Sequence, residues 1–222
     1  KIGVLKSSTR LQIGAGSIGN YAIAPTEVAV QTENGRLKAQ ASIFAGKASA
    51  NLDLGWQDGA PSTFEGSARS FDLLPFLVAI NPSLPDSGRV STEITGSTSL
   101  QFRTGHLSRL SGHFALESCL IRRPGSPLYL EKPTRLEIRD GNYAFDQVHI
   151  KGEETALTLR GSAHDGNINY DMAGVLNLKI LEVLVPEIEA LQGRADVKAT
   201  IRGKADSASF RADVNVTETD HR

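Results

Sequence analysis

Apolar and polar residues alternate with a period of two along most of the 222-residue chain. The alternation is clearest in the stretches ADVKATI (195–201), INYDM (168–172), TALTL (155–159) and HFAL (113–116). Such alternation places one side of each strand on an apolar face and the other side toward water. The pattern therefore predicts a protein built mainly from half-buried β-strands.

Dipeptides that favour tight turns separate these stretches. They are Asn34-Gly35, Asp58-Gly59, Asp140-Gly141 and Asp165-Gly166. Asparagine, aspartate and glycine accept the positive φ angles that two-residue hairpin turns require. Short strands joined by tight turns predict a mainly β fold, in the form of an elongated, curled antiparallel sheet with an open groove.

Two segments break the alternation and predict short amphipathic helices, one near residues 72–81 and one near residues 177–190. Asp72 and Asn177 stand where an N-cap side chain would accept a bond from the first free amides. Pro82 and Pro186 fall where each helix should stop.

The two segments also belong to an internal duplication. Residues 71–89 align with residues 176–194 without a gap, and the turn dipeptides upstream match in the same order. The chain is therefore expected to contain one β-repeat in residues 1–105 and a second in residues 106–222. Together they would form one continuous elongated β unit, and we expect it to be a fragment of a longer protein.

Gly14, Gly16 and Gly19 have the G-x-G-x-x-G spacing of a dinucleotide-binding loop. That loop requires a helix directly after it, but Pro25 falls within the second turn of such a helix and the following residues have no amphipathic stripe. No nucleotide partner is expected. The glycines are instead expected to mark a bulge or kink that lets the sheet curl.

Composition narrows the function further. The formal net charge is −1 and no basic block occurs, which disfavours nucleic acid as a partner. Cys119 is the only cysteine, so an intrachain disulfide is impossible. The five histidines lack metal-ligand spacing, and no G-x-S-x-G elbow occurs. We therefore expect no enzyme activity, no catalytic residues, no metal and no cofactor.

The first helical segment, DLLPFLVAINPSL, is followed by Gly88-Arg89 and by an alternating strand that ends in Ile94-Thr95-Gly96. This arrangement resembles the AsmA-like superfamily. The second copy, from LKILEVLVPEIEALQGR to ADVKATIRG, is similar to the C-terminal repeat region of the TamB family. The glycine-punctuated stretches FAGKASANLDL and GHLSRLSGHFALES fit the same pattern.

The resemblance implies a sheet curled into a groove that is apolar inside and polar outside, within a protein that bridges the periplasm of Gram-negative bacteria. It implies a role in moving phospholipid between the inner and outer membranes, so the partners would be phospholipid acyl chains. An outer-membrane barrel of the TamA type would be a further partner of the full-length protein. The resemblance also implies an N-terminal inner-membrane anchor upstream of residue 1.

The candidate groove residues are apolar positions on the alternating strands: Val90, Ile94, Leu100, Phe102, Phe114, Leu116, Leu157, Leu159, Tyr170, Met172, Val197 and Ile201. They fit either a lipid-facing groove or a dry core packed by side chains. A different function also stays open, namely a periplasmic scaffold that binds unfolded outer-membrane protein strands at its sheet edge by β-augmentation.

Overall fold

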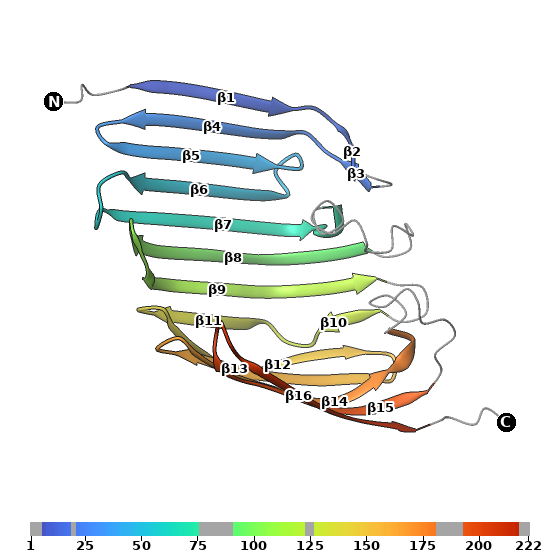
Figure 1. Cartoon of the computed structure of the whole chain (residues 1–222). Coiled ribbons are helices and arrows are strands. Elements are labelled where there is room, and N and C mark those ends of the chain that lie inside the picture. The colour runs from blue at the N-terminus through green and yellow to red at the C-terminus, as the bar shows by residue number, and fades with distance from the viewer. Residues whose placement is uncertain (1–5, 19–20, 76–90, 123–126, 181–192, 218–222) are drawn as a thin grey trace.

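The computed structural model describes residues 6–18, 21–75, 91–122, 127–180 and 193–217, and these residues form one large sheet and one small one (Figure 1). The strands of the first half are β1 (Ser7–Ile13), β2 (Gly16–Ile18), β3 (Tyr21–Ile23), β4 (Thr26–Glu33), β5 (Arg36–Ile43), β6 (Ala48–Gly55), β7 (Pro61–Phe71) and β8 (Ser91–Arg103). Those of the second half are β9 (His106–Arg122), β10 (Leu128–Leu130), β11 (Thr134–Arg139), β12 (Asn142–Gly152), β13 (Thr155–His164), β14 (Asn167–Asn177), β15 (Arg194–Lys204) and β16 (Ser209–Thr217).

The large sheet has 14 strands, and every pairing in it is antiparallel. From β4 onward the strands lie nearly in chain order, while β1 pairs with β4 at one edge and β16 forms the other. The short strands β10 and β11 share the place between β9 and β12. The sheet is nearly flat from β1 to β9 and curls strongly from β11 to β16 (Figure 1). The expected mainly β, curled antiparallel sheet is confirmed.

The turn dipeptides join neighbouring strands. Asn34 and Gly35 connect β4 to β5 with φ angles of 51° and 72°. Asp165 and Gly166 connect β13 to β14 with φ angles of 48° and 75°. Positive φ at both central positions gives a turn whose twist matches that of the flanking strands. The Asn-Gly and Asp-Gly dipeptides thus favour these hairpins because both residues adopt the positive φ angles that the turns require.

Two series of five strands follow the same succession. Strands β5 to β9 follow the turn at Asn34-Gly35, and strands β12 to β16 follow the turn at Asp140-Gly141. The first series therefore ends with β9, which lies within residues 106–222. In each series the third strand leads into one of the segments predicted to be helical. The two series share the large sheet, because β10 and β11 bridge β9 and β12.

The predicted helices fall largely outside the described residues, at 76–90 and 181–192. What is described fits the predicted caps. The Asp72 carboxylate accepts a hydrogen bond from the Leu74 amide at 3.0 Å. The Asn177 side-chain oxygen accepts one from the Lys179 amide at 3.0 Å, and a 3₁₀ turn, η1 (Leu178–Ile180), begins there.

The sequence predicts a bulge or kink in a strand at Gly14, Gly16 and Gly19, and this prediction is wrong. Strand β1 ends at Ile13, and β2 begins at Gly16 in a separate two-stranded sheet with β3. Gly14 therefore lies where the chain leaves the large sheet, while Gly19 is outside the described residues. No nucleotide-type helix follows, because residues 21–23 and 26–33 are strands.

Buried apolar residues are few in the described part of the chain, and two clusters of them lie at the same end of the strands. One cluster joins Phe44, Ala48 and Phe71, and another joins Leu178 to Ala195 and Val197. Other apolar side chains of the described strands are exposed: Leu11 is 55% exposed, Ile13 46% and Phe210 69%. The apolar side of the sheet is therefore covered only in part.

Candidate functional site

One face of the large sheet is apolar from edge to edge, and we call it the apolar face. Residues directly opposite each other in an antiparallel pair share a face. On β7 and β8, Phe64 lies opposite Leu100. On β14 and β15, Tyr170 lies opposite Ile201. The face passes between the halves through Ile138, which lies opposite Gly112 on β9 and Tyr143 on β12.

The structure brings the predicted groove residues together on this face. Those that lie on it are Ile94, Leu100, Phe102, Phe114, Leu116, Leu157, Leu159, Tyr170, Met172, Val197 and Ile201. Val90 lies outside the described residues. At the paired positions of the described strands, this face carries no charged residue.

The opposite face is polar and carries ion pairs between neighbouring strands. Asp171 accepts hydrogen bonds from Arg202 at 2.6 Å and from Arg160 at 3.1 Å. The Arg202 guanidinium, followed by that of Arg160, holds the pKa of the Asp171 carboxyl below its usual value. Charge is thus confined to one side of the sheet, which leaves water as the natural neighbour of that side.

The apolar face contains a cavity of about 490 Å³ over β7, β8, β9 and β11. Large side chains that line it are Leu73, Ile94, Phe114, Leu116 and Leu136. Gly66, Ala68 and Gly96 line the same cavity and bring the backbone close to it. Phe114 is 42% exposed there. The cavity is consequently open, and the chain itself leaves this aromatic side chain without a full apolar cover.

A second cavity of about 240 Å³ lies over the curled part of the sheet. Its apolar lining comes from consecutive strands: Phe145 on β12, Leu159 on β13, Tyr170 and Met172 on β14, Ala199 and Ile201 on β15, and Phe210 on β16. In a flat sheet, strands β12 to β16 would span about 19 Å. Side chains from all of them line one small cavity only because the apolar face is concave here.

Two tyrosines meet on this concave surface. The Tyr143 and Tyr170 hydroxyl groups share a hydrogen bond, although β13 lies between their strands. The ring of Phe145 stacks on that of Tyr170, with centroids 6.1 Å apart. Burial, together with the bond to Tyr143, raises the pKa of Tyr170 to about 12. The pair supplies a polar point within an otherwise apolar surface.

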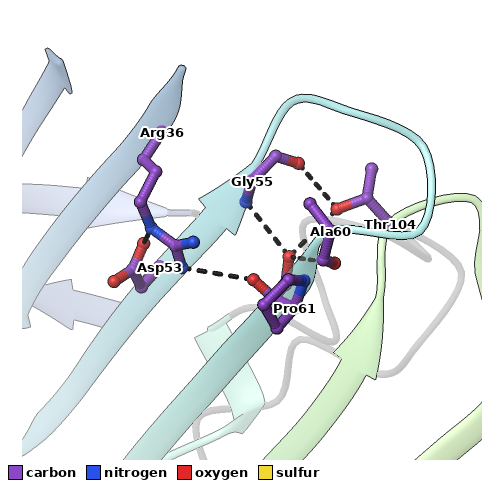
Figure 2. A network of polar contacts seen from close by, with 7 residues as sticks. Arg36, Asp53, Gly55, Ala60, Pro61 and Thr104 are labelled. Atoms are coloured by element: carbon purple, nitrogen blue, oxygen red, sulfur yellow. Dashed lines mark hydrogen bonds and ion pairs between the residues drawn. The ribbon is translucent and has the colours of Figure 1, made fainter. Parts of the chain in front are cut away.

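A polar network holds the hairpins at one end of the strands (Figure 2). The Ser62 hydroxyl, 1% exposed, accepts a hydrogen bond from the Gly55 amide at 3.1 Å and lies 2.9 Å from the Thr104 hydroxyl. Thr104 donates to the Gly55 carbonyl at 2.7 Å. Arg36 bonds both to Asp53 at 2.7 Å and to the Pro61 carbonyl at 3.2 Å (Figure 2). The apolar face therefore ends at this side in a fixed polar rim.

The described residues contain no group of three or more histidine, cysteine or acidic side chains placed to hold a metal ion. Burial raises the pKa of the Cys119 thiol, which keeps it protonated and weakly nucleophilic. Among the described residues, no helix is long and apolar enough to cross a membrane.

Several residues of the apolar face were not singled out in the sequence. Leu136 and Phe145 line the cavities, and Tyr143 bonds to Tyr170. All three stand at alternating positions, so the period-two pattern contained the signal. Their convergence depends on the curl of the sheet, which that pattern does not encode.

The described residues form an all-antiparallel β structure whose large sheet has one polar face and one partly exposed apolar face that is concave at its C-terminal end. Comparison of the chain with protein-family models, curated proteins and solved structures finds no match.

Proposed function

We propose that this chain is a segment of an AsmA-like protein of the TamB type that spans the periplasm, and that its apolar face binds and conducts phospholipid acyl chains between the inner and outer membranes. The observation that carries the proposal is the apolar face itself. It runs across the large sheet without a charge at its described paired positions, and several of its large side chains, among them Leu11, Phe114 and Phe210, are exposed.

An acyl chain suits such a surface energetically. Each methylene group that leaves water contributes about 0.8 kcal/mol, so several contacts in series bind a chain firmly. The contribution is nearly the same at each step, because the face repeats leucine, valine, isoleucine and alanine from strand to strand. A chain can therefore slide along the face without meeting a single deep minimum.

The sheet geometry supports the same function. The two cavities, of about 490 and 240 Å³, lie over successive groups of strands on one face. A lipid tail crossing the strands would pass from the first cavity to the second, across the region where Ile138 links the halves. The charged face would stay in the aqueous periplasm.

The proposal is tested by purifying the chain from the periplasm of a Gram-negative host and quantifying bound phospholipid. Met172→Asp places a carboxylate in the C-terminal cavity and is expected to lower bound lipid several-fold. Ala173→Asp is the matched control, because Ala173 is exposed on the polar face opposite Lys198. Equal lipid in both variants, with unchanged circular dichroism, would contradict the proposal.

A second function, a scaffold for unfolded outer-membrane strands, is favoured by the two edges of the sheet. Strands β1 and β16 each pair on one side only within the large sheet, and neither contains proline. An extended strand could add to either edge through main-chain hydrogen bonds. A proline scan along β16 would then abolish capture of such strands while leaving bound lipid unchanged, whereas Met172→Asp would do the opposite.

A further inference from the structure

The tyrosine pair on the concave part of the apolar face can donate one more hydrogen bond than it makes. Each hydroxyl carries one proton, and the bond between Tyr143 and Tyr170 uses one of the two. Whichever hydroxyl donates within the pair, the other keeps a proton that it can donate outward. Among the described residues, neither hydroxyl has a further hydrogen-bond partner. The pair is therefore a donor that the described part of the chain leaves unused.

Packing fixes the position of this donor. The Tyr170 ring occupies the space over Gly161, where an added Cβ atom would lie 2.1 Å from Cδ1 and 2.7 Å from Cε1 of the ring. The Phe145 ring stacks on that of Tyr170, and both rings line the C-terminal cavity of about 240 Å³. Tyr170 thus holds its hydroxyl beside Tyr143, at the β12 side of this cavity.

The rest of the cavity suits a hydrocarbon chain. Its lining includes the aliphatic side chains of Leu159, Met172 and Ile201, from three successive strands. Arg160 and Asp171 also border the cavity, but these two side chains form an ion pair with each other. A hydrocarbon chain placed there leaves water, which is favourable. The same chain displaces water from the tyrosine pair, so the outward O–H needs an acceptor from the ligand.

The surroundings of the pair favour an uncharged acceptor. The paired positions of β13, β14 and β15 on the apolar face carry no charged side chain. Burial, together with the bond to Tyr143, raises the pKa of Tyr170 to about 12, so the phenol is a neutral donor at ordinary pH. A carboxylate or phosphate would be buried there without a counter-charge, which is far more costly than burying a carbonyl. An ester carbonyl is uncharged, accepts hydrogen bonds and stands at the polar end of each phospholipid acyl chain.

We propose that Tyr143 and Tyr170 form a binding site for the ester carbonyl of a phospholipid acyl chain, with the chain lying over Leu159, Met172 and Ile201. This inference rests on the proposed function and adds which part of the lipid the C-terminal cavity recognises. The aliphatic side chains alone hold an acyl chain equally well at many positions along its length. The hydroxyl pair selects one of these positions, with the ester at β12 to β14 and the chain directed toward β15.

The test compares two lipids that differ in this carbonyl. The delipidated chain is mixed with detergent micelles that contain equal amounts of diester and diether phosphatidylethanolamine of matched chain length. Lipid retained through gel filtration is quantified by mass spectrometry. The wild type is expected to retain the diester over the diether by about three- to tenfold, the factor that one net hydrogen bond supplies. Because both lipids compete in one sample, their ratio does not depend on the fraction of folded protein.

The double variant Tyr143→Phe/Tyr170→Phe keeps both rings and is expected to retain the two lipids equally. Both hydroxyls are removed, because either one left alone can still donate. Tyr129→Phe is the matched control and is expected to keep the wild-type ratio, since Tyr129 is 45% exposed and lies opposite Lys151. Infrared spectroscopy gives a second readout. The ester carbonyl stretch of bound lipid is expected at a lower frequency in the wild type than in the double variant.

The outcomes separate this inference from the proposed function. Equal retention of both lipids by the wild type would overturn the tyrosine site and leave lipid binding by the apolar face intact. A double variant that keeps the preference for the diester would overturn the tyrosine site as well. A wild type that retains neither lipid would contradict the proposed function and the tyrosine site together.

Discussion

The hydroxyl groups of Tyr143 and Tyr170 hydrogen-bond to each other across β13, and the Tyr170 ring lies over Gly161. A Cβ atom placed on Gly161 would come within 2.1 Å of Tyr170 Cδ1 and 2.8 Å of Phe145 Cζ. The missing side chain thus creates the space in which the aromatic rings of β12 and β14 approach each other. The curl of the sheet and this glycine act together.

Gly161→Ala is therefore expected to displace the Tyr170 ring and to destabilise the fold by about 1–3 kcal/mol, the usual cost of overpacking. Urea unfolding followed by circular dichroism measures the change. Gly14→Ala is the control, because a Cβ there meets nothing within 4 Å. It is expected to change the free energy of unfolding by less than about 0.5 kcal/mol. Similar effects of both substitutions would refute the role of Gly161.

The same tyrosine pair predicts a stability change at high pH. The pKa of Tyr170 is raised from 10.0 to about 12, so the folded state holds the phenol proton more tightly than the unfolded state. The resulting stabilisation is complete below pH 10 and is lost as the pH rises from 10 through about 12. Spectrophotometric titration should show tyrosinate forming late in the wild type. Tyr170→Phe should remove that late phase, and a titration identical to the wild type would contradict the assignment.

The rim network predicts a cost for losing one buried hydroxyl. Ser62→Ala leaves the Gly55 amide without its acceptor and removes a partner of Thr104. A buried donor left unsatisfied costs about 1–3 kcal/mol, so the urea midpoint should fall accordingly. Ser49→Ala, which breaks an exposed hydroxyl pair with Ser67, should have little effect. An unchanged urea midpoint for Ser62→Ala would contradict a stabilising role for this network.

The ion pairs of the polar face predict a stability change at low pH. Because the pKa of Asp171 is lowered by Arg202 and Arg160, its contribution is present above the pKa of an unfolded aspartate and is lost as the pH falls through the lower folded value. The urea midpoint of the wild type should be higher than that of Asp171→Asn at neutral pH. The difference between the two midpoints should vanish in acid. A difference independent of pH would contradict the ion-pair origin.

The sequence predicted the local elements well because their causes are local. Asn34-Gly35 and Asp165-Gly166 adopt the positive φ angles that their residue types favour. Asp72 and Asn177 accept amide bonds as N-caps do. The alternation around Val197 predicted its place on the apolar face, since side chains on a strand point to opposite sides in turn.

The sequence did not predict features that depend on the curl or on strand partners. Tyr143 and Tyr170 are separated by a strand, and only the concave face brings their hydroxyls together. The break after Ile13, where the chain leaves the large sheet, has the same local pattern as a bulge within a strand. The predicted groove residues share one face, but their role in binding lipid stays a prediction.

The central claim, a lipid-bearing apolar face, is tested most directly by site-specific photo-crosslinking in cells with radiolabelled phospholipid. Ile201 lines the C-terminal cavity, whereas its neighbour Thr200 lies opposite Asp171 on the polar face. A photo-crosslinking residue at 201 is expected to capture labelled lipid, and the same residue at 200 is expected to capture none. Equal capture at both positions, or none at either, would contradict lipid binding by this face.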